Sequence, residues 1–279
     1  MQVAPSPVPP TLARVPALPP ELAIGTLRLV RDLAVQVGAD LVSLADELRQ
    51  ATDKGGVDLV TRADAHSEHA ITSALHHHFP AHAIAAEEGT RLGPADSPWT
   101  WHIDPLDGTA NYSRGLTPWA ISIGLAYEDE PVLGCIHAPQ AGFTVFGAVG
   151  LGAWDGDAPL APATPAGEMR SWLVASDWPW DLTERQRTVR LLGRMAPHIR
   201  QYKSFGSAAV DLAHLALGRI DAYAISHIFR WDQCGGAAVL RALDYDLRRW
   251  DGGPWTLADR DLVACRPGMR EQFAQWCAD

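Results

Sequence analysis

The sequence predicts an α/β (α+β) protein made of two stacked lobes. Three observations lead to this fold class. Apolar positions with a helical period alternate along the chain with short runs that have the period of strands. Strand-like runs between residues 119 and 149 are joined by short turns, which indicates an antiparallel meander. The length of 279 residues is enough for a sizeable core, in one large domain or in two lobes.

We divide the chain into three parts. Residues 1–20 form a proline-rich head that we expect to stay extended or disordered. Residues 21–158 form an N-terminal α/β lobe, and residues 159–279 form a C-terminal α/β lobe. Strands and helices alternate in both parts, which is typical of stacked α/β layers.

The N-terminal lobe opens with an amphipathic helix. Apolar residues recur at steps of three and four over residues 21–50, and we expect a break near Gly38. A flexible loop at Asp53–Gly56 then leads into a short strand at residues 57–61. The helical pattern thus predicts that the apolar face of this helix packs on the core, and that the strand follows it in the chain.

A second helix is expected over residues 65–79. Asp64 is placed to cap its N-terminus, and Pro80 ends it. A small apolar strand at residues 83–86 follows and ends in Glu87-Glu88-Gly89. These two glutamates therefore stand at a strand end.

The stretch from Trp101 to Tyr112 carries two more acids. Trp101 and Ile103 alternate like a half-buried strand, and Pro105 cannot donate to a continuing ladder. Gly108 and Thr109 indicate a turn that opens a helix, whose first N–H groups have no partner inside the helix. Two carboxylates beside free backbone donors suit a divalent metal and a phosphate bound together.

The rest of the chain continues the alternation. The meander and the second half predict the following elements: strands at 120–126, 132–137, 144–149, 172–176, 201–205 and 220–225, and helices at 183–195, 207–217 and 231–243. Asp232 stands at the start of the last of these helices.

Acids at the ends of apolar elements carry the functional hypothesis. Taken alone, Asp232 is best interpreted as a helix cap and Glu87-Glu88 as a solvated turn. As a set with Asp104 and Asp107, they form carboxylates that repel one another unless a cation neutralises them. Hard oxygen ligands without Cys or His nearby favour Mg²⁺ or a related ion over zinc.

Composition excludes several classes of protein. The net charge of −10 argues against a nucleic-acid-binding surface. The four cysteines form no CxxC pair, which is typical of reduced thiols. No apolar run is long enough for a membrane span, and the N-terminus lacks a signal-peptide pattern. We therefore expect a cytoplasmic protein without a nucleic-acid or membrane partner.

Three segments together resemble the signature motifs of the inositol monophosphatase family, a group of Mg²⁺-dependent, lithium-sensitive phosphatases. Glu87-Glu88-Gly89 is similar to its EE motif, residues 104–112 (DPLDGTANY) to its DP(I/L)DGTxN(F/Y) motif, and Trp231-Asp232 to its WD motif. The segments 57–61, 206–209 and 218–223 add to a likeness that runs from Glu21 to the C-terminus.

The resemblance implies a layered α/β/α/β/α fold and two or three Mg²⁺ per active site. It implies a first metal held by Glu87, Asp104 and the Leu106 carbonyl, and a second held by Asp104, Asp107 and Asp232. It implies hydrolysis of a small phosphorylated metabolite by metal-activated water, with Glu87, Thr109 and Asp107 as catalytic residues. A homodimer is expected from the resemblance alone.

Further roles follow from the same resemblance. Gly108 and Thr109 would offer backbone N–H groups to the phosphate, and Ala208 and Asp232 would contact the substrate. Glu88 and Asp64 would orient the metal ligands or hold a third, weaker metal.

One position departs from the family pattern. Many inositol-hydrolysing members carry a glutamate seven residues before the WD aspartate, where this chain has Ile225. An apolar side chain cannot accept hydrogen bonds from a polyol, so we expect myo-inositol 1-phosphate not to be the best substrate. An inositol-phosphate-like or histidinol-phosphate-like monoester, a sugar bisphosphate, a nucleotide phosphate and adenosine 3′,5′-bisphosphate stay open, as does a catalytically silent interaction module.

Two other residue groups receive a structural interpretation. The histidines from His66 to His82 lack a zinc-type partner and are interpreted as a solvated helix face. The tryptophans, including Trp178-Pro179-Trp180 and Trp99/Trp101, are interpreted as core and interface aromatics rather than as a stacking platform.

Overall fold

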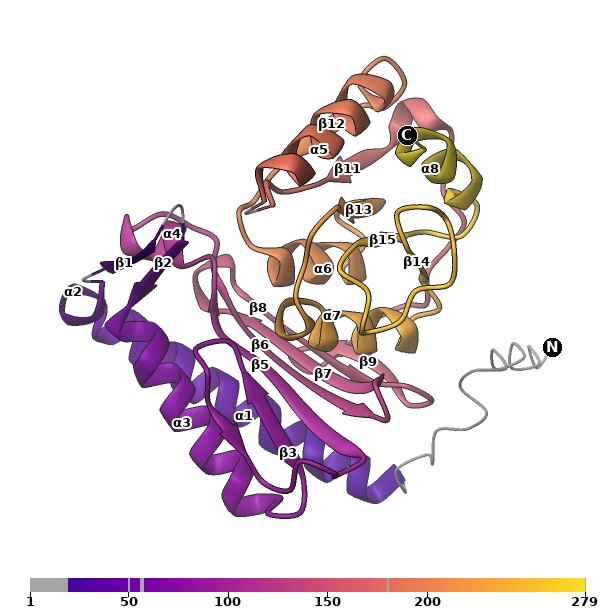
Figure 1. Ribbon diagram of the computed structural model, residues 1–279. Helices are drawn as coiled ribbons and strands as arrows, with labels where there is room; N and C mark the ends of the chain where they lie inside the picture. The colour runs from indigo at the N-terminus through magenta and orange to yellow at the C-terminus, as the bar shows by residue number, and fades with distance from the viewer. Residues whose placement is uncertain (1–19, 50, 56–57, 180, 279) are drawn as a thin grey trace.

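The computed structural model describes residues 20–49, 51–55, 58–179 and 181–278. Five layers follow one another in Figure 1: α1 and α3, a large sheet, α6 and α7, a small sheet, and finally α5 and α8. The layered α/β/α/β/α arrangement is therefore confirmed. The proline-rich head lies outside the described residues except for Pro20, where α1 begins.

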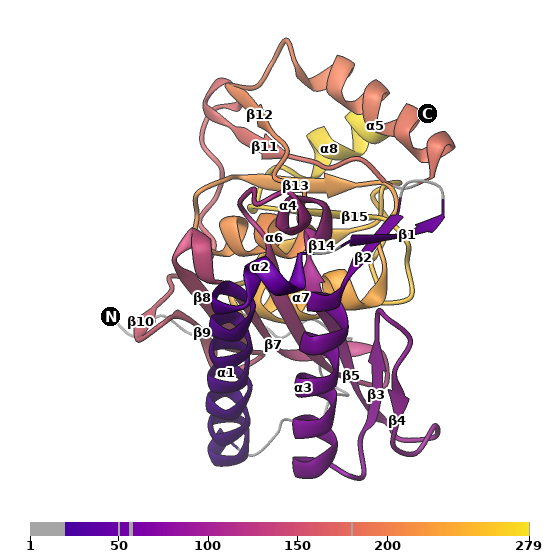
Figure 2. The ribbon, with the colours of Figure 1, turned by 90° about the vertical axis from the view of Figure 1, so that its left-hand side faces the viewer.

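Eight α-helices lie within the described residues. They are α1 (Pro20–Ser43), α2 (Ala45–Leu48), α3 (Arg62–His78), α4 (Thr109–Ser113), α5 (Leu182–Met195), α6 (Ala208–Ala216), α7 (Arg230–Ala242) and α8 (Arg270–Cys277). Figure 2 shows α1 and α3 running alongside each other on the outer face of the large sheet. None of the described helices is long and apolar enough to span a membrane.

The described strands form three sheets. A hairpin consists of β1 (Ala51–Gly55) and β2 (Asp58–Thr61). The large sheet has the order β10-β9-β8-β7-β6-β5-β3-β4, with β3 (Ala83–Ala86), β4 (Arg91–Leu92), β5 (Trp99–Asp107), β6 (Ala120–Tyr127), β7 (Glu130–Ala138), β8 (Phe143–Ala148), β9 (Gly152–Asp155) and β10 (Ala158–Pro159). The small sheet has the order β12-β11-β13-β15-β14, with β11 (Leu173–Ala175), β12 (Gln201–Lys203), β13 (Ala222–Ile225), β14 (Asp246–Arg248) and β15 (Leu262–Cys265).

Side-chain alternation explains why the small sheet is covered on both faces. In β13, Tyr223 and Ile225 join the core shared with α6 and α7, whereas Ala222 and Ala224 join the core shared with α5 and α8. Successive residues of a strand point to opposite faces of the sheet, so a fully apolar strand contributes side chains to a hydrophobic core on each face. A third core fills the space between the large sheet and α1 and α3.

Glycines allow α7 to approach the large sheet closely. A Cβ atom on Gly134 in β7 would lie 2.0 Å from the carbonyl oxygen of Gly235 in α7, and one on Gly124 in β6 would lie 2.5 Å from the Gly235 nitrogen. Such contacts permit no side chain at these two strand positions. The start of α7, which carries Asp232, is thereby held over the middle of the sheet.

Three local predictions are corrected by the structure. Helix α1 runs through Gly38 without a break, because this glycine makes room for the His137 ring, only 2.4 Å from where its Cβ would lie. The expected loop at Asp53–Gly56 is largely strand β1, within the hairpin. Helix α3 begins at Arg62 rather than residue 65, with Thr61 as its N-cap.

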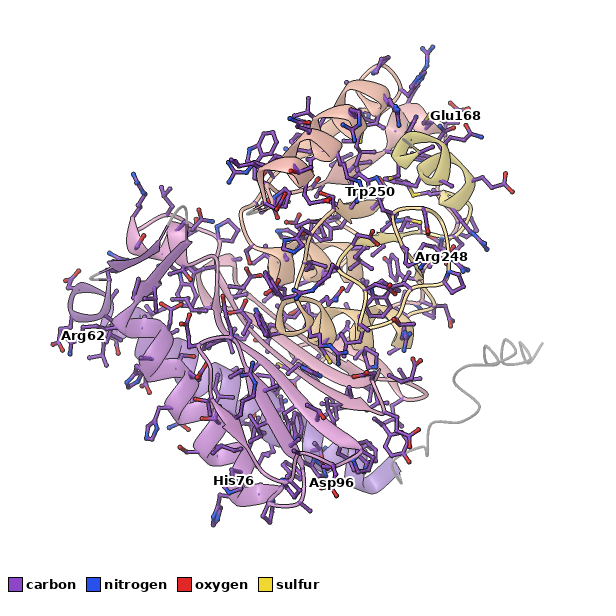
Figure 3. The ribbon with its side chains drawn as sticks, in the orientation of Figure 1. Arg62, His76, Asp96, Glu168, Arg248 and Trp250 are labelled. Atoms are coloured by element: carbon purple, nitrogen blue, oxygen red, sulfur yellow. The ribbon has the colours of Figure 1, made fainter. Side chains whose placement is uncertain are left out.

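The predicted solvated histidine face is confirmed for four histidines of α3 but is wrong for His82, which follows the helix, is partly buried and stacks on Phe79 and Trp99. His66, His69, His77 and His78 are exposed, and in Figure 3 Arg62 and His76 mark the two ends of this outer helix. The predicted meander is also confirmed, because β6, β7 and β8 pair in antiparallel order. The lobe boundary between residues 158 and 159 stays a prediction.

Candidate active site

A cleft of about 550 Å³ lies between the two halves of the molecule. Every residue that we predicted as a metal ligand or substrate contact lies on it: Glu87, Asp104, Leu106, Asp107, Gly108, Thr109, Ala208 and Asp232. The two residues predicted to act behind them, Glu88 and Asp64, do not line it. Segments separated by more than a hundred positions in the chain are thus brought to one place.

An irregularity in β5 places Asp104 and Asp107 on the same side. Residues three apart in a regular strand face opposite sides. The pairing of β5 with β6 shifts register between Asp104 and Asp107, where Pro105 interrupts the ladder. The Ser67 hydroxyl on α3 donates to the Pro105 carbonyl at 2.7 Å and holds this bend in place.

Glu87 enters the cleft from the turn after β3. Its backbone nitrogen donates to the Ile103 carbonyl at 3.0 Å, which keeps the turn beside β5. The carboxylate of Glu68, a residue missed in the sequence, accepts from the backbone nitrogens of Glu88 and Thr90. The turn is therefore held by hydrogen bonds to a side chain of α3, and the interpretation as a solvated turn is wrong.

Asp232 has two functions at the start of α7. Its Oδ2 accepts from the Phe229 nitrogen at 2.9 Å, which satisfies one free N–H of the helix N-terminus. Its carboxyl group also hydrogen-bonds to Asp104. The cap interpretation and the convergence of the acids are both correct.

Burial makes these carboxyl groups hard to ionise. Asp104 is 2% exposed, and loss of solvation, followed by the charge of Glu87, raises its pKa well above the usual value. Loss of solvation also raises the pKa of Asp107 to about 8 and that of Asp232 to about 7. A cation in the cleft would reverse these shifts, because it favours the ionised forms.

The acids contact one another in the structure. Asp104 hydrogen-bonds to Glu87 as well as to Asp232. As the side chains stand, the described residues contain no group of three or more Asp, Glu, His or Cys that could hold a metal ion. The donor set nevertheless fits a hard divalent cation, because it consists of oxygens whose mutual repulsion needs a positive charge.

The Thr109 hydroxyl belongs to a hydrogen-bond chain. It lies 3.0 Å from Asp64 Oδ1 and 3.0 Å from the Leu106 carbonyl. Asp64 in turn accepts from the backbone and hydroxyl of Thr61 through Oδ2. Asp64 is therefore the third residue (N3) of a capping box and not the N-cap itself. Its Oδ1 atom, which takes no part in the capping box, holds the Thr109 side chain.

Helix α6 contributes to the site through Asp107. Ser207 Oγ donates to Asp107 Oδ2 at 2.9 Å, and the Ala209 nitrogen donates to the same oxygen. Asp177, which the sequence did not single out, accepts from Ser204 Oγ and the Gly206 nitrogen and so holds the loop before α6. Its position directly after the predicted strand at 172–176 was the signal that was missed.

A second wall of the cleft comes from the segment between β13 and α7. Alternate residues line it, namely Ile225, His227, Phe229 and Trp231, whereas Ile228 is buried away from solvent. Ser226 donates to the Glu184 carbonyl of α5 at 3.0 Å. The apolar residue at position 225 therefore lies in the cleft, as its sequence position suggested.

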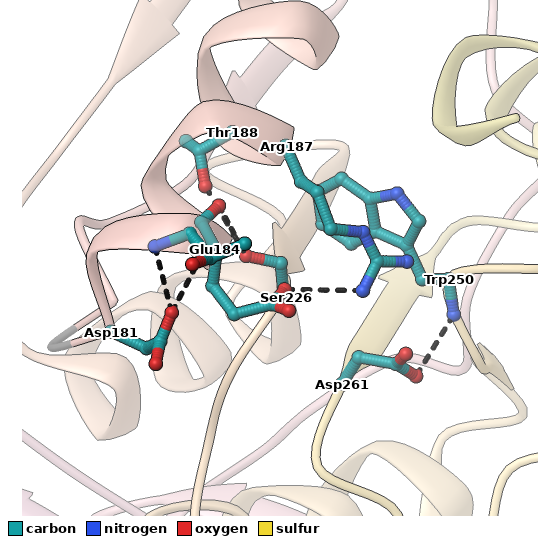
Figure 4. Close-up of polar contacts among 8 residues, drawn as sticks. Asp181, Glu184, Arg187, Thr188, Ser226, Trp250 and Asp261 are labelled. Atoms are coloured by element: carbon teal, nitrogen blue, oxygen red, sulfur yellow. Dashed lines mark hydrogen bonds and ion pairs between the residues drawn. The ribbon is translucent and has the colours of Figure 1, made fainter. Parts of the chain in front are cut away.

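The rim is completed by residues at the start of α5. Asp181 caps α5 by accepting from the nitrogens of Thr183 and Glu184, as Figure 4 shows. Arg187 stacks on Trp250, 5.3 Å from the ring centroid. These contacts fix the helix turn from which Arg185 reaches the cleft, next to Trp178 and Pro179.

Trp178 corrects one interpretation made from the sequence. We interpreted it as a core or interface aromatic, but its side chain is 53% exposed and lines the cleft. Trp101, in contrast, is fully buried as expected. Trp180 lies outside the described residues.

Comparisons with known proteins agree with the fold and the motifs. The model of the inositol monophosphatase family matches residues 26–278. An inositol-1-monophosphatase from Synechocystis is 31% identical over 269 residues, which are 95% of this chain and 93% of the relative. Nus factor SuhB from Vibrio cholerae is 29% identical over 78% of this chain and 82% of its own. The solved inositol monophosphatase from Anabaena has a TM-score of 0.80 at 28% identity, covering 91% of this chain and 95% of that one.

Proposed function

The chain belongs to the inositol monophosphatase family and is a phosphoric monoester hydrolase, and we propose that it cleaves a small phosphate monoester with the help of Mg²⁺. The convergence of Glu87, Asp104, Asp107 and Asp232 on one cleft is the observation that carries this proposal. The raised pKa values of Asp104, Asp107 and Asp232 support a site that is completed by positive charge.

The proposed ligand set is the one that the family resemblance implies, and the convergence of the acids on one cleft supports it. Glu87, Asp104 and the Leu106 carbonyl would hold one Mg²⁺, and Asp104, Asp107 and Asp232 a second, with Glu88 and Asp64 in support or around a third. When bound, these ions neutralise charge on the phosphoryl oxygens and the leaving group and make water more acidic. Lithium sensitivity, implied by the family resemblance, belongs to the same proposal.

The chain's own groups orient the reactants. The Thr109 hydroxyl, fixed by Asp64 and the Leu106 carbonyl, would orient the attacking water together with Glu87. Gly108 adopts a left-handed conformation at φ 94°, which turns the chain so that its own N–H and that of Thr109 can face a phosphate group. Ala208 and Asp232 would contact the rest of the substrate.

The proposal is tested with Asp104→Asn and Asp232→Asn. Each variant removes one anionic ligand without changing side-chain size, so we expect phosphate release from p-nitrophenyl phosphate in Mg²⁺ to fall by about 10²-fold or more. The matched control is Asp181→Asn on the exposed rim, which should retain activity. Near-normal turnover in either site variant would contradict the ligand assignment.

The remaining properties belong to the same proposal. We propose a homodimer in the cytoplasm that acts on a small phosphorylated metabolite and not on nucleic acid, in keeping with the net charge of −10. A catalytically silent interaction module is the alternative, and the name of the SuhB relative makes it worth testing. Absence of p-nitrophenyl phosphate hydrolysis at every Mg²⁺ concentration would favour that alternative.

A further inference from the structure

We propose that the preferred substrate is a phosphate monoester whose alcohol carries a planar aromatic ring close to the ester oxygen. This inference rests on the proposed phosphatase function and names the substrate class of the same cleft. It narrows the open candidates, because nucleoside and imidazole-bearing phosphates carry an aromatic ring whereas sugar and inositol phosphates do not.

The walls of the cleft differ in chemistry. The carboxylates of Glu87, Asp104, Asp107 and Asp232 occupy one part, next to Thr109. The alternate residues of the segment 225–231 present an aliphatic side chain, an imidazole, a phenyl ring and an indole. A phosphate bound at the acids would place its alcohol against this second wall.

The phenyl and indole rings form a rigid stack. Phe229 and Trp231 lie 5.1 Å apart with ring planes only 4° from parallel. The Arg260 guanidinium lies 4.4 Å from the Phe229 ring centroid. Because Phe229 is contacted by both Arg260 and Trp231, the next surface on which a ring can stack is that of Trp231, which lines the cleft.

Trp178 adds a second aromatic surface at the rim. Trp178 leaves 53% of its surface exposed, so it offers an apolar aromatic area to a ligand. Its position on the cleft suggests that a ligand covers it. The adjacent Pro179, which is buried and also lines the cleft, limits the freedom of this segment.

Polar groups on this wall suit a ring better than a polyol. Ile225 offers no hydrogen bond to a hydroxyl group. His227 Nδ1 is buried and has no hydrogen-bond partner among the described residues, and Arg185 also lines the cleft. On this wall one imidazole nitrogen and one guanidinium can contact a heteroatom or the face of a ring, and the other polar side chains of the cleft, Asn111, Asp177, Ser204 and Ser207, come from different segments.

The test compares benzyl phosphate with cyclohexylmethyl phosphate. The two esters have the same carbon skeleton and differ in aromaticity, so hydrophobic burial alone would treat them nearly alike. We expect kcat/KM to favour benzyl phosphate by roughly twofold to tenfold, the value of one aromatic contact. Both should exceed inositol 1-phosphate.

Variants at the rim of the cleft test whether a preference for benzyl phosphate depends on Trp178. Trp178→Ala should bring the benzyl to cyclohexylmethyl ratio towards one, and Trp178→Phe should largely restore it. Leu182→Ala removes a side chain that is 70% exposed at the start of α5 and does not line the cleft, so it should leave the ratio unchanged.

The possible outcomes distinguish failure of the aromatic substrate class from failure of the proposed phosphatase function. Equal hydrolysis of both esters, or faster hydrolysis of inositol 1-phosphate, would overturn the aromatic substrate class and leave the phosphatase in place. A preference that survives Trp178→Ala unchanged would also overturn it, because the cleft wall would then not be its source. No hydrolysis of any ester would instead refute the proposed function.

Discussion

At the scale of single residues, ionisation of the buried Asp107 side chain destabilises the folded protein when no metal ion is bound. Burial raises its pKa from 3.8 to about 8. The unfolded chain releases this proton near 3.8, whereas the folded chain keeps it to about 8, so the folded state binds more protons between these values. The free energy of unfolding therefore falls as the pH rises through this window.

Asp107→Asn tests this linkage. The amide does not titrate, so the melting temperature of the variant minus that of the wild type should grow from pH 5 to pH 9 when EDTA removes divalent ions. Thermal unfolding followed by circular dichroism measures it. Asp181→Asn is the control, because the pKa of Asp181 is lowered by backbone N–H groups and this carboxyl stays ionised over the whole range. A difference that does not change with pH would show that Asp107 is not buried as described.

At the scale of elements, the contact of α7 with the large sheet decides where Asp232 lies. Gly134→Ala would place a methyl group against the backbone of Gly235, 2.0 Å from its carbonyl oxygen. We expect a loss of about 1–3 kcal/mol in the free energy of unfolding from overpacking, together with lower phosphatase activity because α7 shifts. Urea unfolding and p-nitrophenyl phosphate hydrolysis measure the two effects.

Gly193→Ala is the matched control for this prediction. Gly193 lies in α5, and a Cβ on it would meet no atom within 4 Å. Because alanine has the higher helix propensity, this variant should gain roughly 0.5–1 kcal/mol and keep its activity. If Gly134→Ala behaved in the same way as Gly193→Ala, the close approach of α7 would not position the site.

At the scale of the whole molecule, the site joins both sheets through the central helices. The proposed metal ligands come from the turn after β3, from β5 and from α7, while α6 holds Asp107. Mg²⁺ should therefore stabilise the entire fold, by about 2.7 kcal/mol at a concentration 100 times its Kd. Differential scanning calorimetry should show this gain in the wild type and little of it in Asp104→Asn. Equal gains in both proteins would place the bound Mg²⁺ elsewhere.

Much of this organisation could be predicted from the sequence because it rests on local patterns. The helices and strands follow from their periods, whereas the order of the layers was implied by the family resemblance, and Asp104, Asp107 and Asp232 were found through their motifs. Contacts between distant segments leave no such pattern. Glu68 on α3, for example, accepts a hydrogen bond from the backbone nitrogen of Glu88, which lies 20 positions further along the chain. The close contact of Gly38 in α1 with the His137 ring, a hundred residues away, likewise leaves no local pattern.

Diffraction from crystals soaked in Mn²⁺, recorded at the manganese absorption edge, tests most directly whether the four acids form one divalent-cation site. The expected result is anomalous density between Glu87 and Asp104 and between Asp107 and Asp232, with Asp104 touching both positions. Manganese bound only elsewhere on the surface, with no anomalous density beside the four carboxyl groups, would contradict it.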